Sequence, residues 1–275
     1  MSMSVSQASF PQSLKPYPED VVQTAGPILR LEQVGFAYDG RDVLKNLSFS
    51  VKRGELITIL GPSGCGKTTL LNIIAGFLRP GSGLAQVNDH EITEPGPDRG
   101  VVFQSYALFD WMNIEDNIAF SLRCGGKSKQ EQLAVATKMV ALVGLQGFEK
   151  HFPYQLSGGM RQRCGLARVL AANPSVMLMD EPFAAVDVQT RETLQEEIVR
   201  IKTETQCTII FITHSIDEAV FISDRVFLMR KGQLGAFDEF VVDLPEPRSS
   251  AENRLHPEFL SVREKIYRAM RAEAS

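Results

Sequence analysis

Residues Gly61 to Thr69 have the types and spacing of a segment that wraps around phosphate groups. They read Gly-Pro-Ser-Gly-Cys-Gly-Lys-Thr-Thr, which matches the phosphate-binding loop pattern of many nucleoside triphosphatases. Glycines let the backbone curl so that consecutive N–H groups point inward, and a following helix adds the partial positive charge of its N-terminus. Lys67 would place a cation beside the terminal phosphates, and the Thr68 hydroxyl suits Mg²⁺, which prefers oxygen ligands. The segment therefore predicts a site for a nucleotide with Mg²⁺.

The flanking sequence favours this interpretation over a chance glycine-rich turn. Glu55–Leu60 is a nearly continuous β-branched apolar run, typical of a strand buried on both faces of a parallel sheet, and a helical stretch follows the loop. Cys65 is interpreted as a small spacer that offers its backbone N–H, with a reactive thiol at a helix N-terminus as the alternative. The predicted phosphate-contacting residues are Gly61, Pro62, Ser63, Gly64, Cys65, Gly66, Lys67, Thr68 and Thr69.

Six further motifs narrow the prediction because they stand in the order of one known family. Leu156–Arg163 resembles the signature motif of ABC ATPases, and Val176–Pro182 resembles a Walker B strand with its following glutamate. The other four resemble the A-loop aromatic, the Q-loop glutamine, the D-loop aspartate and the H-loop histidine: Tyr38, Gln104, Asp187 and His214. The resemblance covers about residues 28–237. It implies an α/β P-loop ABC ATPase fold, with a mainly parallel sheet, an antiparallel β subdomain and a helical subdomain.

The resemblance implies a role in ATP hydrolysis for each of these residues. Glu181 would orient or deprotonate the attacking water, His214 would contact the γ-phosphate, and Gln104 would reach the metal and that water. Tyr38 would stack on adenine. The implied Mg²⁺ ligands are Thr68, Gln104 and Asp180. Taken singly, such a histidine is more often structural, an Asp-Glu pair often starts a helix, and a tyrosine is often core. Their joint occurrence in order favours the catalytic interpretation.

Ser157, Gly158 and Gly159 are expected to form a second anion site, from a serine hydroxyl and bare N–H groups at a helix start. In the family that this chain resembles, that site contacts the γ-phosphate held by the other subunit, and Asp187 also lies at the nucleotide. The resemblance thus implies a pair of ATPase subunits, expected to be a homodimer. Each subunit would supply its phosphate loop and borrow the signature of its partner.

The remaining sequence predicts one domain of alternating strands and helices. Residues 1–27 are expected to be a flexible tail, and residues 28–275 the ABC ATPase domain, with a helical subdomain at about 105–170 and a C-terminal helix at about 257–272. A turn at Asp39-Gly40 would join two antiparallel strands, and Gly125-Gly126 would interrupt the helical part. Further predicted strands are Leu47–Val51, Asn88–Ile92, Gly100–Phe103, Val176–Met179, Thr208–Thr213, Val226–Met229 and Gln233–Phe237.

Helical spacing of apolar residues predicts two packed faces. Leu194, Ile198 and Ile201 define one of them. In the C-terminal helix, Phe259, Val262, Ile266 and Met270 are expected to pack on the domain rather than on a partner.

Composition limits the possible partners. The formal net charge of −4 gives no basic footprint for nucleic acid. No apolar run approaches the roughly 18–20 residues that a bilayer crossing needs. A secretory signal pattern is absent, and the four cysteines lack metal-binding spacing, so reduced thiols in the cytosol are expected. Together with the resemblance, these features predict a peripheral subunit at the cytoplasmic face of the inner (plasma) membrane.

Several strings resemble the ATPases of nitrate, sulfonate and taurine importers, among them Gly96–Gln104 and Asp116–Phe120. This resemblance implies integral membrane permease subunits as partners and, indirectly, a solute-binding protein. Phe109 and Trp111 are candidates for the permease groove, with the core of the helical part as the alternative. Asp110 departs from the family pattern, in which a proline usually precedes the tryptophan.

Three alternatives to an importer subunit are weighed. A soluble, non-transport ABC ATPase usually carries a long coiled-coil insertion or two cassettes, and this chain has one set of motifs. A P-loop kinase or unrelated ATPase acting alone would leave Leu156–Arg163 without a function. A scaffold that does not hydrolyse ATP is disfavoured by the intact Glu181 and His214.

Overall fold

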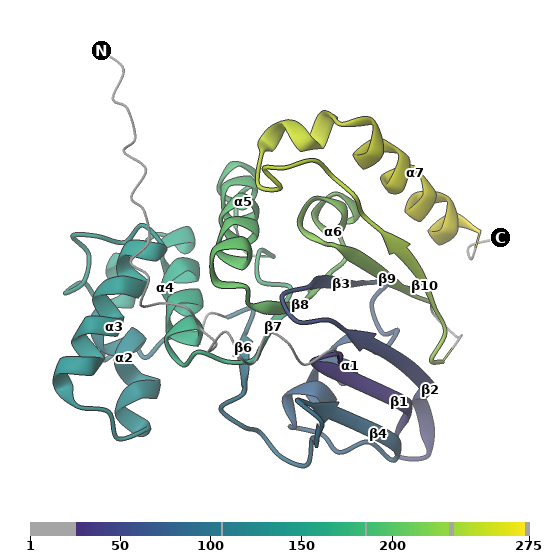
Figure 1. Cartoon of the computed structure of the whole chain (residues 1–275), viewed down its shortest axis with the longest axis horizontal. Helices are drawn as coiled ribbons and strands as arrows, with labels where there is room; N and C mark the ends of the chain where they lie inside the picture. The colour runs from purple at the N-terminus through teal and green to yellow at the C-terminus, as the bar shows by residue number, and fades with distance from the viewer. Residues whose placement is uncertain (1–25, 106, 185, 231–233, 273–275) are drawn as a thin grey trace.

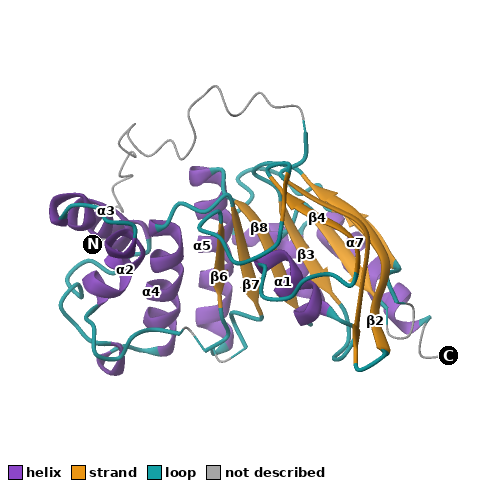
Figure 2. Ribbon diagram, turned by 90° about the horizontal axis from the view of Figure 1, so that it is seen from below, coloured by secondary structure: helices purple, strands orange, loops and turns teal. Residues whose placement is uncertain are grey.

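The computed structural model describes residues 26–105, 107–184, 186–230 and 234–272. Most of the predicted N-terminal tail therefore lies outside the described residues, as does Gln233, the start of one predicted strand. The described chain forms two sheets with helices on both sides of the larger one (Figures 1 and 2). No helix of this described part is long and apolar enough to span a bilayer.

The larger sheet is six-stranded, in the order β10-β9-β3-β8-β7-β6, and only β10 runs antiparallel to its neighbour. β3 and β8 are buried at every position, as expected for parallel strands covered on both faces. The strands are β3 (Leu56–Leu60), β6 (Arg99–Val102), β7 (Val176–Asp180), β8 (Thr208–Thr213), β9 (Arg225–Met229) and β10 (Phe237–Val241). β10 begins at Phe237, the residue at which the predicted strand Gln233–Phe237 ends. That prediction was therefore displaced by about the length of the strand.

The smaller sheet is antiparallel, with the order β2-β1-β4-β5. β1 (Leu29–Tyr38) and β2 (Arg41–Val51) meet at the predicted Asp39-Gly40 turn, where both residues have positive φ. Only the middle of the strand predicted at Asn88–Ile92 is confirmed, as the two residues of β5. Asn88 and Asp89 have φ values of 50° and 60° and form the turn between β4 (Ser82–Val87) and β5 (His90–Glu91).

Helix α1 (Lys67–Ala75) lies between the two sheets. Its apolar residues share one buried core with the small sheet and with one face of the large sheet. The helix predicted after the phosphate loop ends at Ala75, because Gly76 takes a left-handed conformation with φ of 82° and caps it. α1 therefore starts at the phosphate loop and is held in place by both sheets.

Three helices stand together beside the β6 edge of the large sheet (Figures 1 and 2). They are α2 (Ile114–Cys124), α3 (Lys129–Leu142) and α4 (Gly158–Ala171), with a short 3-10 turn, η3 (Pro153–Gln155), before α4. The predicted break at Gly125 lies directly after α2, and Ser128 and Glu131 form a capping box that starts α3. These helices lie within the region predicted to be a helical subdomain, and its separateness stays a prediction.

The other face of the large sheet carries α5 (Val188–Thr205), α6 (Ile216–Ile222) and α7 (Pro257–Arg271), with η4 (Ala251–Leu255) before α7. Phe259, Val262 and Ile266 of α7 are buried, and Met270 packs against the same core, so the expected core packing is confirmed. Sequence analysis missed α6.

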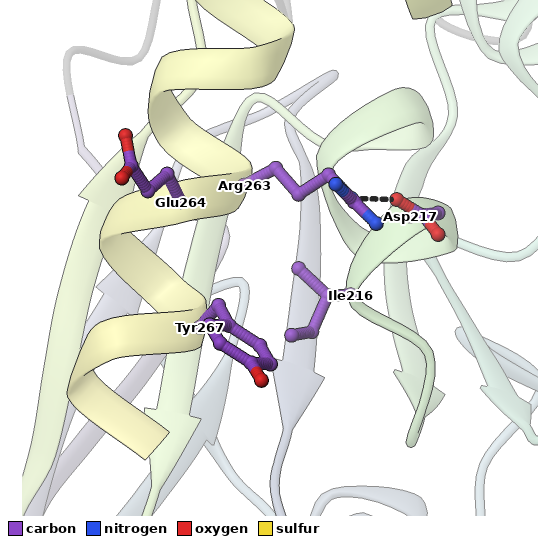
Figure 3. A pocket seen from close by; sticks show the side chains of 5 residues that line it. All are labelled: Ile216, Asp217, Arg263, Glu264 and Tyr267. Carbon is purple, nitrogen blue, oxygen red and sulfur yellow. Dashed lines mark hydrogen bonds and ion pairs between the residues drawn. The ribbon is translucent and has the colours of Figure 1, made fainter. Parts of the chain in front are cut away.

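A surface pocket of about 500 Å³ lies between α6 and α7. Arg263 and Tyr267 of α7 point toward α6 there, and Arg263 pairs with Asp217 at 2.5 Å (Figure 3).

Candidate nucleotide-binding and hydrolysis site

The loop between β3 and α1 has the curled backbone that its glycines permit. Gly64 and Gly66 have φ values of 80° and 101°, a region that side-chain-bearing residues rarely adopt. A Cβ at Gly61 would lie 2.6 Å from the Met229 carbonyl oxygen. Glycine is thus required at Gly64 and Gly66 by the backbone conformation, and at Gly61 by the close approach of β9.

The Lys67 side chain lies across this loop. It is 6% exposed, and its Nζ donates to the carbonyl oxygens of Gly61 at 2.8 Å and Pro62 at 3.0 Å. A pocket of about 220 Å³ opens beside it and is lined by Tyr38, Val43, Gly64, Gly66, Lys67, Thr68 and Thr69. The structure therefore brings the predicted phosphate-contacting lysine and threonines to one cavity with the predicted adenine-stacking tyrosine.

Tyr38 stands at the end of β1, on the rim of this pocket. Its ring packs edge-to-face on Phe36 with centroids 4.8 Å apart, yet Tyr38 is 49% exposed. One aromatic contact therefore fixes the ring while much of its surface stays open. An aromatic surface that is held in this way can stack on a flat base.

The polar candidates follow four strands that are adjacent in the sheet. In the order β3-β8-β7-β6, the phosphate loop follows β3, His214 follows β8, Asp180 ends β7, and Gln104 lies in the exposed turn after β6. The registers align these ends, since Leu60 pairs with Thr213 and Asp180 with Ile212. Carboxyl ends of parallel strands form the ligand edge of open α/β sheets.

Asp180 is directly connected to the phosphate loop. The Thr68 hydroxyl lies close enough to its carboxylate to influence the pKa of Asp180. Burial, and then the charge of Glu181, raise the pKa of Asp180, whereas the Lys67 ammonium and the Thr68 hydroxyl lower it. A carboxylate and a hydroxyl in contact are two hard oxygen ligands, and a bound cation would offset the burial of the charge. These residues therefore fit Mg²⁺.

Glu181 and His214 lie next to each other. The Glu181 backbone has φ of 43°, and its N–H donates to Ile212 of β8 at 3.0 Å. Its Oε2 is 3.4 Å from His214 Nδ1, and two thirds of the His214 side chain is exposed. A small cavity of about 50 Å³ beside them is also lined by Phe183, Ala184, Arg191, Thr213 and Glu218. A positive φ is uncommon for a residue other than glycine, so the backbone at Glu181 has a special conformation.

Ser157 and Asp187 cap neighbouring helices. Ser157 Oγ accepts from Met160 N at 3.2 Å at the start of α4, and Asp187 Oδ1 accepts from Thr190 N at 3.0 Å at the start of α5. The backbone hydrogen bond from Thr190 lowers the pKa of Asp187. A Cβ at Gly159 would lie 2.7 Å from Thr190 Cγ2, so the two helix starts are in contact.

The signature residues lie apart from the phosphate pocket of their own chain. Among the described residues that line the two cavities, none is Ser157, Gly158, Gly159 or Asp187. The structure therefore separates the predicted site into a sheet edge that carries Lys67 and a pair of helix starts that carries Ser157.

The two aromatic candidates lie in a short, tightly held loop. Asn117 is fully buried; its amide donates to the carbonyl oxygens of Phe109, Met112 and Asn113 and accepts from Phe109 N at 2.9 Å. Phe109 packs on Phe120 with ring centroids 4.5 Å apart, while Trp111 is 73% exposed. Phe109 thus belongs to the packing of the helical part, whereas Trp111 is available to a partner.

Sequence analysis missed three residues around His214. Thr213, Glu218 and Arg191 line the small cavity and contact one another. The pattern Ser215-x-x-Glu218 was available as a sign of a capped helix start. The pairing of Glu218 with a residue of α5, however, depends on how the helices pack.

The fold and the row of strand ends define a P-loop ATPase. The ABC transporter family model matches residues 44–184. An uncharacterised ABC transporter ATP-binding protein of Methanocaldococcus jannaschii is 46% identical over 241 residues, covering 86% of this chain and 88% of that protein. The taurine import ATP-binding protein TauB of Escherichia coli O157:H7 is 41% identical over 243 residues, covering 87% of this chain and 95% of TauB.

A solved structure agrees with these sequence comparisons. It is the dimeric, post-hydrolysis state of the ATP-binding cassette MJ0796 bound to ADP and Pi, with a TM-score of 0.67 and 29% identity. The match covers 78% of this chain and 99% of that one. The chain belongs to the ABC transporter family. It is an ATP-binding subunit with ABC-type ATPase activity, and the predicted fold class is confirmed.

Proposed function

We propose that this ATPase subunit energises an importer for small anions such as taurine, other sulfonates or nitrate. It would work at the cytoplasmic face of the inner membrane, as one half of a homodimer bound to permease subunits that receive solute from a binding protein. The similarity to TauB supports the class of solute. The absence of a spanning helix among the described residues agrees with a peripheral subunit that relies on separate membrane partners.

The separation of Lys67 from Ser157 supports hydrolysis by a pair of subunits. Ser157, Gly158 and Gly159 begin α4, where unpaired N–H groups and the helix dipole favour an anion, yet none of them lines the pocket beside Lys67. A second copy of the chain would bring its own α4 start to that pocket. The similar cassette was solved as a dimer with ADP and Pi. Closure of the pair and completion of the charge-stabilising site would then be a single event.

The residues at the sheet edge divide the chemistry among them. Mg²⁺ would neutralise charge on the phosphates, held by Thr68, Asp180 and Gln104. Lys67 would bind the terminal phosphates. Glu181 would hold the attacking water as general base, and His214 would hold the γ-phosphate and keep the Glu181 carboxylate in place from 3.4 Å.

The single observation that carries this assignment is the 3.4 Å approach of Glu181 and His214, which follow the next two strands beside β3, the strand of the phosphate loop. Glu181→Gln keeps the shape of the side chain and removes its basicity. We expect it to bind ATP, to lose hydrolysis and to run as an ATP-dependent dimer on a sizing column. Glu204→Gln, an exposed residue in the last turn of α5, is the matched control and should behave like wild type. A Glu181→Gln protein that stays monomeric with ATP and still hydrolyses it contradicts the composite site.

The exposed Trp111 supports a permease contact near Phe109. We expect Trp111→Ala to lower the ATPase rate stimulated by the permease while ATP affinity and the basal rate stay unchanged. Pull-down identifies the membrane subunit, and reconstitution in liposomes with a binding protein tests the solute. Stimulation by taurine, an alkanesulfonate or nitrate supports the anion assignment. Stimulation only by solutes that carry neither a sulfonate nor a nitrate group refutes it, and unchanged coupling in Trp111→Ala removes the docking site.

A further inference from the structure

The start of α6 departs from the usual capping arrangement. Ser215 is the N-cap of α6 and accepts from Glu218 N at 3.3 Å, as in a capping box. In that motif the glutamate returns to the backbone N–H of the serine. Here Ser215 N donates to Thr213 Oγ1 at 3.0 Å, and Glu218 Oε2 accepts from the Thr213 hydroxyl at 2.5 Å. The Glu218 carboxylate is therefore engaged away from the cap of its own helix.

These hydrogen bonds connect the residues on either side of His214. Thr213 precedes His214 and Ser215 follows it, and the Thr213 hydroxyl joins the two by accepting from Ser215 N. Because the same hydroxyl donates to Glu218, the carboxylate fixes its direction. Thr213 and Glu218 are 2% and 7% exposed, whereas most of the His214 side chain is exposed. The exposed His214 is thus flanked by buried residues that are hydrogen-bonded to one another.

Glu218 also faces Arg191 of α5, the helix that begins next to Asp187. Arg191 Nη2 donates to the Val186 carbonyl oxygen at 3.0 Å, and its Nε lies 3.7 Å from Glu218 Oε1. Helices α5 and α6 are in contact on the same face of the sheet (Figure 1). The Arg191 guanidinium therefore contacts both the backbone just before Asp187 and the Glu218 carboxylate. That carboxylate in turn accepts from Thr213, the residue before His214.

The carboxylate in this contact is largely removed from water, whereas the Arg191 side chain is 32% exposed. The Glu218 side chain is 9% exposed, and the Nε of Arg191 is buried without a hydrogen-bond partner among the described residues. The adjoining cavity of about 50 Å³ has room for a water between polar groups. Loss of Arg191 would leave the buried Glu218 carboxylate without its cation, which is more disruptive than loss of a surface ion pair, whereas the partly exposed Arg191 keeps its hydrogen bond to the Val186 carbonyl oxygen when Glu218 is lost.

We propose that Arg191 and Glu218 are positioning residues that connect the segment before Asp187 to His214. A shift of Val186 and Asp187 moves the Arg191 guanidinium, changes the hold of Glu218 on Thr213, and alters the placement of His214 beside Glu181. The proposal rests on the proposed function, since it needs His214 and Asp187 to act at the nucleotide. Neither Arg191 nor Glu218 contacts the nucleotide in this scheme.

A second ion pair joins α5 to the far end of α6 and provides a matched control. Lys202 Nζ of α5 is 3.0 Å from Asp224 Oδ2, two residues after the end of α6. Its partners are also partly buried, with side chains 19% and 34% exposed. Lys202→Ala therefore removes a similar link between the same elements, away from His214. If Arg191–Glu218 is only a structural link, the two losses should have the same consequence.

The test compares ATP hydrolysis by full-length Glu218→Ala, Arg191→Ala, the double variant and Lys202→Ala. We expect the first two to lower kcat by about tenfold or more with KM for ATP within about twofold of wild type, because misplacement affects the reacting geometry rather than binding. The double variant should lose no more than the worse single variant, since both act through one contact. Lys202→Ala should keep the wild-type kcat.

Two conservative variants keep the test independent of folding. Thr213→Ser retains the hydroxyl and should stay near wild type, whereas Thr213→Val removes it and should follow Glu218→Ala in kcat. Unchanged kcat in Glu218→Ala and Arg191→Ala overturns the proposal, and so does an equal loss in Lys202→Ala. Additive losses in the double variant also overturn it. Failure of the proposed function itself is distinguishable, because Glu181→Gln would then retain hydrolysis.

Discussion

Asn117 provides a test of what stabilises the loop that contains Trp111, because its one buried amide hydrogen-bonds to the main chain of Phe109 and Met112. The Asn117 side chain accepts from Phe109 N at 2.9 Å and donates to Phe109 O at 3.1 Å. The substitution Asn117→Ala removes both contacts and leaves a small cavity at the base of α2. The exposed Trp111 should then lose its fixed direction although nothing in the phosphate loop has changed.

The size of the effect follows from the groups left unpaired. Each buried polar group without a partner costs about 1–3 kcal/mol, and two main-chain groups, Phe109 N and Met112 O, lose their Asn117 contact, whereas Phe109 O keeps Met112 N at 3.0 Å. Because Phe109 is only half-buried, water reaches part of the vacated space, and we expect a loss of about 2–4 kcal/mol in the free energy of unfolding. That loss corresponds to a fall in Tm of roughly 5–15 °C for a chain of this size.

Urea unfolding measures the loss, and the fluorescence anisotropy of Trp111, the one tryptophan of the chain, reports the local loosening. The matched control is Asn113→Ala, which removes a more exposed cap contact to Asp116 N and should cost about 1 kcal/mol. Stimulation by the permease should fall in Asn117→Ala while basal hydrolysis persists. A variant no less stable than Asn113→Ala, with unchanged Trp111 anisotropy, would show that the amide does not hold the loop.

Three further predictions concern other parts of the molecule. Gly66→Ala must adopt φ near 101° with its Cβ 2.9 Å from a β2 side chain, so equilibrium dialysis should show loss of ATP binding. At pH 8 a thiol reagent should modify the exposed Cys124 in the folded protein but spare Cys164, because burial raises the pKa of that thiol to about 12. Ile266→Ala should cost about 2–4 kcal/mol in urea unfolding, whereas Tyr267→Ala, at a half-exposed position of the same helix, should cost far less.

Local sequence was sufficient to predict the phosphate loop and the strands that feed it. A glycine-rich pattern between an apolar run and a helix is compatible with few structures other than a phosphate loop. The apolar run Leu56–Leu60 is indeed fully buried. The order of the strands could not be predicted in the same way. That β8 and β7 lie between β3 and β6 is decided by pairing between residues far apart in the chain, for which no local signal exists.

The errors in secondary structure have similar causes. β4 was missed because its Ser82-Gly83 start has low β propensity, yet Gly83 is required there. Its φ is 79°, and a Cβ would lie 2.3 Å from the Gln33 carbonyl oxygen of β1. Helix α6 is short and almost wholly buried, so it lacks the polar face that reveals an amphipathic helix. In both cases tertiary packing overrides the local preference.

The division of the site between two structural supports has a mechanical consequence. Lys67, Asp180 and Glu181 stand on strands with buried interiors, which resist displacement. Ser157 and Asp187 stand instead at the contacting starts of α4 and α5. In the proposed dimer, a partner's nucleotide that engages these starts would act on helices rather than on the sheet, and the contact from α5 to Glu218 would be a route from there back to His214. Because the link runs through one guanidinium, removing it should lower the rate of hydrolysis while the pocket keeps its affinity for ATP.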